Sequence, residues 1–282
     1  MKPFAPAGGK APRALPALIA AIALAAGCAT QEKKSEIPPV VPELRPGIVA
    51  GYLPMGALPD SLALLPPPPA VGSAAFAADE EAYRNTRLLR GSPRYTQATK
   101  DANLIFPQAT QNFACALDAP ISKDSTPHLY TLMRRSATDS GLATQTVRDK
   151  YHRMRPFAFH NDSSCTPQAE HALRQAGSYP SAHASIGWTW ALLLAEVAPE
   201  RSDALLARGL SYGQSRVICG AHWQSDVSQG RVIGAGTLAR LHSDPVFRAE
   251  VEEAKKEVVG ARQKAMRPAL DCKAEAAALG QR

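Results

Sequence analysis

Two arginines in the segment 148–156 have a spacing that suits an oxyanion site. Arg148 and Arg155 lie seven residues apart, which is two turns of an α-helix, so a helix would point both guanidinium groups the same way. An arginine side chain can donate hydrogen bonds to two phosphate oxygens at once, and it stays charged at any relevant pH. The segment therefore predicts an anion-binding fork, although by itself it is also typical of a solvated basic helix face.

A second segment, residues 177–183, lies directly before an apolar stretch that begins at Ser185. A helix that starts here would present free amides and a partial positive charge, which favour phosphate binding. We expect the Ser181 hydroxyl and the Ala182 amide to hold the phosphate and His183 to donate a proton to the leaving oxygen. The same residues alone would also serve as an ordinary helix cap.

A third segment, residues 215–226, contains His222 and Asp226 four residues apart. On a helix, that carboxylate can reach one imidazole nitrogen and leave the other free as a nucleophile. Arg216 would add another guanidinium group. A histidine with an aspartate one turn later is often structural, but three phosphate-suited segments with different roles in one chain favour a phosphoryl-transfer site.

The same residues allow an alternative interpretation as a metal site. His183, His222 and Asp226 are ligand types that divalent metals accept. The three arginines, if they converge there, would repel a cation and attract an anion. They would also stabilise the charge that develops on the equatorial oxygens during phosphoryl transfer. We therefore predict no metal and no other cofactor.

The segments that must position these residues are almost all helical in pattern. The stretch at 185–197 is apolar nearly all round and predicts a buried helix, and Ser202 with Asp203 predicts a cap for the helix that follows it. No alternating strand pattern of useful length and no internal repeat is present. The predicted class is therefore all-α. The predicted helices cover residues 78–89, 95–104, 126–157 as one or two helices, 185–197, 202–219, 224–241 and 246–266.

The remaining parts of the chain have a different character. Residues 28–76 are rich in proline and predict an extended arm, which we interpret as a spacer in preference to a ligand for a proline-reading domain. Residues 77–262 form the predicted helical catalytic domain, and residues 263–282 a loose C-terminal tail.

The first 27 residues predict an export signal. Basic residues precede an apolar run at 14–26, which is too short to span a bilayer comfortably, and no later stretch approaches about 18 uninterrupted apolar residues. The residues that end at Cys28 resemble a bacterial lipobox. We expect cleavage before Cys28 and lipidation of its thiol, with a plain cleaved signal as the alternative. The expected location is the periplasm, with an outer-membrane anchor through Cys28.

The net charge limits the kinds of partner that the chain can bind. The net charge of +7 suits nucleic acid, an anionic membrane surface or small anions. The basic residues are scattered and not interleaved with aromatics, so no nucleic acid is predicted as a specific partner.

Four cysteines follow Cys28, and an even number suits two disulfides in an oxidising compartment, with three pairings open. None has zinc-ligand spacing. They are Cys115, Cys165, Cys219 and Cys272.

The chain resembles the phosphatidic acid phosphatase type 2 superfamily, and most closely its bacterial class A nonspecific acid phosphatases. The likeness runs from about residue 65 to residue 247 and includes Gly91-Ser92-Pro93-Arg94 and the segments 153–159, 177–183 and 213–226. The resemblance implies a compact helical bundle of the phosphatase and haloperoxidase type, with no metal requirement. It also implies a periplasmic or outer-surface location.

The resemblance also implies roles for single residues. His222 attacks phosphorus, Asp226 supports it and His183 protonates the leaving alcohol. The phosphate is cradled by Arg148, Arg155, Ser181, Ala182 and Arg216. Two positions depart from the family, which usually has lysine at Arg148 and glycine at Ala182, and neither replacement is equivalent in reach or backbone freedom. We expect an active enzyme, with activity reduced or substrate range narrowed by these departures.

The expected function is a metal-independent acid phosphatase that forms a phosphohistidine and acts on many small phosphomonoesters, with phosphate and vanadate as competing anions. The alternatives are a vanadate-dependent haloperoxidase and a catalytically impaired phosphate-binding surface lipoprotein. The sequence leaves open whether the chain forms a homo-oligomer. The resemblance covers Cys165 and Cys219 and favours their pairing, and we expect Cys115 to pair with Cys272.

Overall fold

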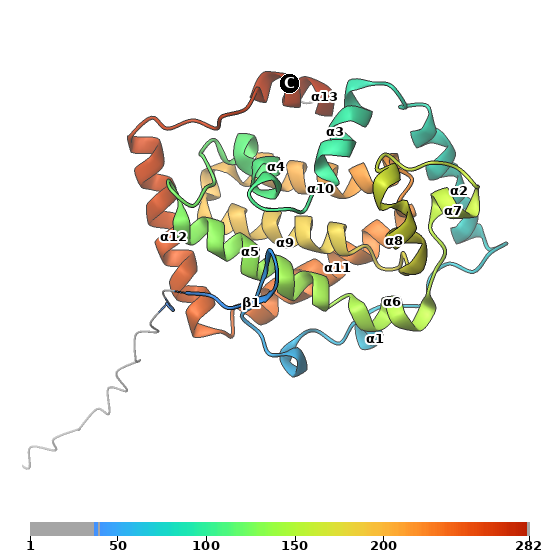
Figure 1. Cartoon of the computed structure of the whole chain (residues 1–282), viewed down its shortest axis with the longest axis horizontal. Coiled ribbons are helices and arrows are strands. Elements are labelled where there is room, and N and C mark those ends of the chain that lie inside the picture. The colour runs from blue at the N-terminus through green and yellow to red at the C-terminus, as the bar shows by residue number, and fades with distance from the viewer. Residues whose placement is uncertain (1–36, 39, 281–282) are drawn as a thin grey trace, which may run out of the picture. The chain divides into compact units, whose positions relative to one another are not determined.

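The structure is a computed structural model that describes residues 37, 38 and 40–280. The predicted signal peptide (residues 1–27) and Cys28 lie outside the described residues. The described chain is helical apart from one antiparallel hairpin (Figure 1), so the predicted all-α class is confirmed. No helix among the described residues is long and apolar enough to cross a membrane.

The element order is as follows. The hairpin consists of β1 (Glu43–Arg45) and β2 (Ile48–Val49), and short 3-10 turns lie at Met55–Ala57, Pro167–Ala169 and Pro199–Arg201. The helices are α1 (Ser61–Leu64), α2 (Ala74–Arg87), α3 (Pro93–Asp101), α4 (Gln108–Leu117), α5 (Pro127–Leu142), α6 (Gln145–Tyr151), α7 (Pro156–Phe159), α8 (Glu170–Gln175), α9 (Ala182–Val197), α10 (Ser202–Ile218), α11 (Gln224–Leu241), α12 (Pro245–Gln263) and α13 (Cys272–Leu279).

The core is built around α9, which packs against α5, α10 and α11 and contacts α12 (Figure 1). Most of its apolar side chains are buried, as the sequence predicts for 185–197, and Trp190 and Leu193 are fully enclosed. A helix that is apolar all round must lie inside the bundle, because any exposed face would leave apolar surface in water. The first turn of α9 is thereby held at a defined place in the molecule.

Glycines on α11 let that helix approach the backbone of α9. A β-carbon at Gly230 would lie 2.4 Å from the carbonyl oxygen of Ser181, and one at Gly234 would lie 2.5 Å from that of Ser185. Both distances are well inside van der Waals contact, so only glycine fits without a shift of the helices. This close packing places the 177–183 segment beside the start of α11, where the 215–226 segment ends.

Helix ends differ from the sequence prediction in places. Residues 126–157 form three helices, α5, α6 and α7, where one or two were predicted. The expected cap at Ser202 and Asp203 is wrong, because Arg201 is the residue that precedes the first helical residue of α10 and no side chain caps it. A 3-10 turn leads directly into this helix, so its first amides lie in a continuous helical stretch.

The segment predicted as an extended spacer is partly folded onto the helical body. Tyr52 and Leu65 are buried, and the Tyr52 hydroxyl donates a hydrogen bond of 2.5 Å to Glu250 on α12. The amide of Tyr52 donates to Asp139 on α5, against which Gly51 packs closely. These contacts depend on single residues and not on a repeating apolar pattern, so the periodicity of the sequence does not predict them.

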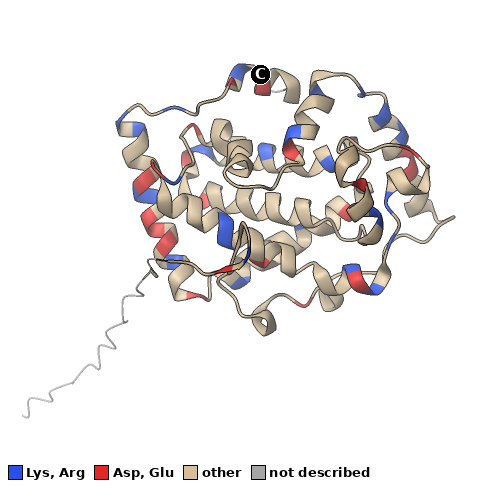
Figure 2. Ribbon diagram, in the orientation of Figure 1, with Lys and Arg blue, Asp and Glu red and all other residues tan. Residues whose placement is uncertain are grey.

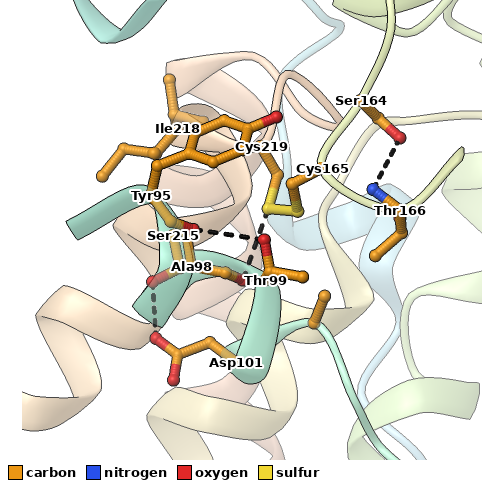
Figure 3. Close-up of a disulfide and its surroundings, with 12 residues drawn as sticks. Tyr95, Ala98, Thr99, Asp101, Ser164, Cys165, Thr166, Ser215, Ile218 and Cys219 are labelled. Atoms are coloured by element: carbon orange, nitrogen blue, oxygen red, sulfur yellow. Dashed lines mark hydrogen bonds between the residues drawn. A yellow bond between two sulfur atoms is a disulfide. The ribbon is translucent and has the colours of Figure 1, made fainter. Parts of the chain in front are cut away.

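The C-terminal segment also differs from the prediction of a loose tail. Residues 272–279 form α13, and Cys272 at its start is joined to Cys115 on α4. The second disulfide joins Cys165 to Cys219, beside Tyr95, Ala98 and Ile218 (Figure 3). Both predicted pairings are present in the structure.

Charged residues are spread over most helices, with Lys and Arg mixed among Asp and Glu along the ribbon (Figure 2). The most acidic stretch visible lies on α12, where Glu252 and Glu253 pair with Lys255 and Lys256. Arg155 and Arg216, in contrast, are buried.

Candidate active site

The three predicted segments meet at one place in the fold. His183 lies in the first turn of α9, Arg216 in the last turn of α10, and His222 in the short turn before α11. Nη1 of Arg155 lies 2.9 Å from Nε2 of His222. The charge of Arg216 lowers the pKa of both histidines, and His222 also lowers the pKa of His183. Residues from four separate elements therefore share one site.

His222 is held in a single tautomer. Its Nδ1 lies 2.8 Å from the backbone carbonyl oxygen of Ser178, and a carbonyl oxygen only accepts, so Nδ1 carries the hydrogen. Nε2 therefore keeps its lone pair, toward which Arg155 donates. The side chain is buried, and burial, followed by the charges of Arg155 and Arg216, lowers the pKa of His222 well below its ordinary value. His222 is thus a neutral imidazole with Nε2 as its reactive nitrogen.

Asp226 lies beside His222, but not with the helical geometry that the sequence spacing predicts. Its Oδ2 is 3.6 Å from Nδ1 of His222, which is too long for a good hydrogen bond, and instead accepts from the Trp223 amide at 2.8 Å. The reason is local: His222 lies in the turn between α10 and α11, and α11 begins only at Gln224, so the two residues do not share a helix. The Ser178 carbonyl orients the ring, and Asp226 contributes a nearby negative charge.

Two residues that the sequence analysis assigned no role hold Asp226 in place. Arg153 donates to Asp226 Oδ1 at 2.6 Å and to Asp79 Oδ2 at 2.7 Å. Asp79 also accepts from the amide of Ser225 at 2.8 Å. Burial raises the pKa of Asp226, and the charge of Arg153 opposes that rise. Arg153 lies in a segment that carries the family resemblance, but no sequence signal connects it to Asp79, which is on α2.

Arg155 is buried and tightly held by the backbone. Its Nε donates to the carbonyl oxygen of Leu173 at 2.8 Å, Nη1 donates to that of Ala221 at 2.9 Å and Nη2 to that of Gly177 at 3.2 Å. Burial and the neighbouring charge of Arg216 lower the pKa of Arg155 to about 9. The guanidinium group therefore remains a cation at neutral and acidic pH, in a fixed orientation toward His222.

Arg216 is buried without enough protein partners. It is 2% exposed, and its Nε and Nη1 have no hydrogen-bond partner among the described residues. Burial lowers its pKa to about 10, so it is still charged at neutral pH. A buried cation with unpaired donors is costly for a folded protein. An anion that entered the site would supply the missing partners.

Arg148 is close to the site but does not share a helix with Arg155, so that prediction is wrong. The helix α6 ends at Tyr151, and His152 has a φ of 40°, which turns the chain before Arg155. Arg148 Nη2 donates to Gln145 at 2.6 Å, while its Nε has no partner among the described residues. Its charge lowers the pKa of both Arg155 and His222, which places it within electrostatic reach of the site.

The start of α9 has the features expected of an anion seat. Ser181 is the N-cap, and its hydroxyl oxygen accepts from the Ala184 amide at 3.2 Å, which leaves the hydroxyl hydrogen free to donate. The amides of Ala182 and His183 belong to the first turn, where no intrahelical acceptor exists. Ser181, Ala182 and His183 thus lie where the sequence predicts them, at the N-terminus of a buried helix.

His183 is also oriented by the backbone. Its Nε2 lies 3.0 Å from the carbonyl oxygen of Ala102, to which it donates, so Nδ1 is the nitrogen that gains or loses a proton. Burial and then the charge of Arg216 lower the pKa of His183 well below its ordinary value. A bound anion would offset that positive charge and make protonation of His183 easier.

A cavity of about 1160 Å³ reaches this site. His183 and Arg216 line it, together with residues of α3, α4 and α13, among them Gln97, Gln111, Ala274 and Glu275. Among the residues that the structure describes, no group of three or more His, Cys, Asp or Glu side chains is arranged to hold a metal ion.

Comparison with known proteins agrees with this arrangement. Residues 129–248 match the PAP2 superfamily. A non-specific acid phosphatase of Providencia stuartii is 45% identical over 207 residues, which is 73% of this chain and 84% of the relative. A non-specific acid phosphatase of Salmonella typhimurium is 42% identical over 69% of this chain and 78% of the relative. An acid phosphatase of Zymomonas mobilis is 39% identical over 78% and 83%.

The fold and site therefore define a protein of the helical phosphatase class. The chain belongs to the PAP2 superfamily, in the group of bacterial non-specific acid phosphatases. The resemblance stated from the sequence is confirmed.

Proposed function

We propose that this chain is an acid phosphatase that hydrolyses phosphomonoesters without a metal ion, through a phosphohistidine formed on Nε2 of His222. The observation that carries the proposal is the pairing of an unprotonated, buried Nε2 with the fixed guanidinium of Arg155, 2.9 Å away. Arg216 adds buried donors with no protein partner among the described residues. A phosphate group fits both needs, because it offers an electrophile to the nitrogen and oxygens to the arginines.

In the first step, the lone pair of His222 Nε2 attacks phosphorus and the bond from phosphorus to the ester oxygen breaks. The proton on Nδ1 of His183 moves to that oxygen, and the alcohol leaves. Arg155 and Arg216 hold the equatorial oxygens, with the Ser181 hydroxyl and the Ala182 amide as further donors. Arg148 contributes positive charge from the side of the site.

In the second step, neutral His183 takes a proton from water as that water attacks phosphorus. The nitrogen–phosphorus bond breaks, and its electron pair returns to His222 Nε2. Throughout both steps, Nδ1 of His222 keeps its hydrogen and donates it in a hydrogen bond to the Ser178 carbonyl oxygen. The positive charge that the phosphorylated ring carries is offset by Asp226, 3.6 Å from Nδ1. Dividing one displacement into two lowers the barrier of each.

A phosphatase is favoured over a vanadate-dependent haloperoxidase because the relatives at 39–45% identity are named acid phosphatases. Vanadate, which resembles phosphate in charge and shape, then competes with substrate, as does inorganic phosphate. Small phosphomonoesters are the proposed substrates. An impaired phosphate-binding lipoprotein is less favoured, because the relatives at 39–45% identity are named acid phosphatases.

The proposed location is the periplasm, with a lipid anchor at Cys28 on the outer membrane. Two disulfides support an oxidising compartment. Cys28 and the signal segment lie outside the described residues, so this part of the proposal depends on the sequence pattern. Mass spectrometry of the N-terminal peptide from a bacterial host distinguishes a lipidated Cys28 from a plain cleaved terminus.

The decisive experiment measures p-nitrophenol release from p-nitrophenyl phosphate at mildly acidic pH with excess EDTA. The proteins are the wild type, His222→Ala and the matched variant His242→Ala, whose imidazole is partly exposed and pairs with Glu196. We expect EDTA-resistant turnover in the wild type and His242→Ala and none in His222→Ala. Rapid quenching should trap an acid-labile phosphoprotein. Turnover that stops in EDTA, or continues in His222→Ala, would overturn the mechanism.

A further inference from the structure

The short C-terminal helix α13 forms part of the wall of the cavity that reaches the catalytic site. Ala274, Glu275 and Ala278 of α13 line the same cavity as His183 and Arg216. Ala274 and Ala278 are four residues apart and so lie on one face of the helix. His183 is the proposed proton donor to the alcohol, so this cavity lies on the side of the site where the alcohol part of the substrate must fit.

Two specific links hold α13 in place. Its first residue, Cys272, is disulfide-bonded to Cys115 on α4. One turn later, Glu275 accepts a hydrogen bond of 2.8 Å from Nε of Arg208 on α10. No residue of α13 is fully buried, and a helix of this length is marginal in water by itself. The two links, more than apolar packing, therefore determine where this wall lies.

The Glu275 link continues to the helix that presents Arg216. Arg208 is buried and pairs with Asp101 on α3 at 2.5 Å. Asp101 in turn accepts a hydrogen bond from the hydroxyl of Ser215, as Figure 3 shows, and Ser215 precedes Arg216 in α10. Figure 1 shows α13 next to α3, with which it is in contact. The wall is thus fixed in relation to the end of α10 that carries Arg216.

We propose that α13 is a specificity element that limits the size of the leaving group reaching His183. This inference rests on the proposed function. The small alanine side chains of α13 leave room on this side of the cavity, so the position and size of the side chains on this face set the space for the leaving group. The face of α13 discriminates between bulky and small alcohols, while the arginines that bind phosphate treat both alike.

The test compares two substrates that share the phosphate and differ in leaving-group size: glycerol 2-phosphate and 4-methylumbelliferyl phosphate. Ala274→Trp and Ala278→Trp in the full-length protein place a large side chain on the cavity face. Ala277→Trp is the matched control, because Ala277 belongs to the same helix, is exposed and does not line the cavity. We expect kcat/KM for the bulky ester to fall about tenfold relative to the small one in the first two variants.

The inhibition constant of inorganic phosphate checks the phosphate site and should change less than twofold in all three variants. A second arm removes one anchor with Cys115→Ser/Cys272→Ser, in which we expect the bulky ester to gain relative to the small one. Wild-type turnover of both esters tests the proposed function separately, and its absence would overturn that function and this inference together. If both esters are turned over and Ala274→Trp and Ala278→Trp leave their ratio equal to that of Ala277→Trp, α13 does not select substrates.

Discussion

Arg153 Nη1 lies 2.6 Å from Asp226 Oδ1, and the same guanidinium reaches Asp79 through Nη2. The side chains of all three residues are buried. Arg153 therefore connects α2 to the start of α11 and fixes the carboxylate that lies beside the nucleophile. Its guanidinium donates to Asp226, Asp79 and the Ser225 hydroxyl, so it acts on the nucleophile through Asp226, as a positioning residue.

Replacing Arg153 with glutamine should slow the reaction more than it weakens substrate binding. Asp226 would lose both its position and the charge that opposes the rise in its pKa, so we expect kcat to fall about a hundredfold with little change in KM. Protonation of Asp226 would begin at higher pH, which moves the acidic limb of the pH–rate profile upward. Arg90→Gln, which removes an exposed ion pair with Asp162, is the control. An unmoved acidic limb would leave Arg153 a purely structural role.

The unpaired donors of Arg216 among the described residues predict that this side chain lowers the stability of the ligand-free protein and is needed to bind phosphate. Arg216→Met removes a buried cation whose Nε and Nη1 have no hydrogen-bond partner in the part of the chain that the structure describes. The ligand-free variant should therefore unfold at a higher temperature than the wild type while losing activity. Phosphate at a hundred times its Kd should stabilise the wild type by about 2.7 kcal/mol and the variant not at all. Denaturation with and without phosphate measures both effects.

Arg208 is the matched comparison, because it lies two turns earlier on α10 and is equally buried but fully paired with Asp101 and Glu275. Arg208→Met should destabilise the protein by about 3–5 kcal/mol, since it leaves a buried carboxylate uncompensated. If Arg216→Met destabilises the ligand-free protein as much as Arg208→Met does, Arg216 has a structural partner that its geometry does not indicate.

The two histidines predict an acidic, bell-shaped pH profile. Burial, Arg155 and Arg216 lower the pKa of His222, so it stays neutral and nucleophilic down to acidic pH. Burial and Arg216 also lower the pKa of His183 in the free protein, so its acid form is lost as pH rises. A bound phosphate dianion offsets the arginines and raises the pKa of His183.

The alkaline limb of kcat, which reports the complex, should therefore lie at higher pH than that of kcat/KM, which reports the free enzyme. Steady-state rates of p-nitrophenyl phosphate hydrolysis between pH 4 and 9 test this order. A flat profile, or an alkaline limb that falls at the same pH for both constants, would count against His183 as the proton donor.

Gly230 should be required for both packing and catalysis. In Gly230→Ala the new methyl group would lie 2.4 Å from the Ser181 carbonyl oxygen, so α11 must move away from the start of α9. We expect a loss of about 1–3 kcal/mol of stability and a fall in kcat, measured by urea denaturation and by turnover. Gly236→Ala on the same helix makes only ordinary contacts, the nearest at 3.6 Å, and should keep full activity.

The helical core was largely predictable. The stretch 185–197 is apolar all round and became the buried α9, and residues 224–241 match the bounds of α11. Errors arose where local geometry departs from a regular helix. The spacing of Arg148 and Arg155 suggested one helix face, but His152 ends α6 between them. Likewise His222 and Asp226 are four residues apart, but α11 begins only at Gln224, so His222 lies in the turn before the helix.

The folded N-terminal segment and α13 were not predictable from periodicity. Tyr52 is held by hydrogen bonds to Glu250 and Asp139, and α13 by a disulfide and an ion pair. Such links join residues that are far apart in sequence, and no repeating apolar pattern precedes them. The same holds for Asp79, whose contact with Arg153 depends on how α2 packs.

The amino-acid sequence by itself determined the residue types of the site, the all-α class and the family, because charge, hydrophobic period and motif spacing are local properties of the chain. Tertiary structure decided which nitrogen of His222 is reactive, since the Ser178 carbonyl that holds Nδ1 comes from a distant segment. It also decided that Arg216 would be buried with unpaired donors. Both outcomes depend on burial and on contacts between elements, which exist only once the helices have packed.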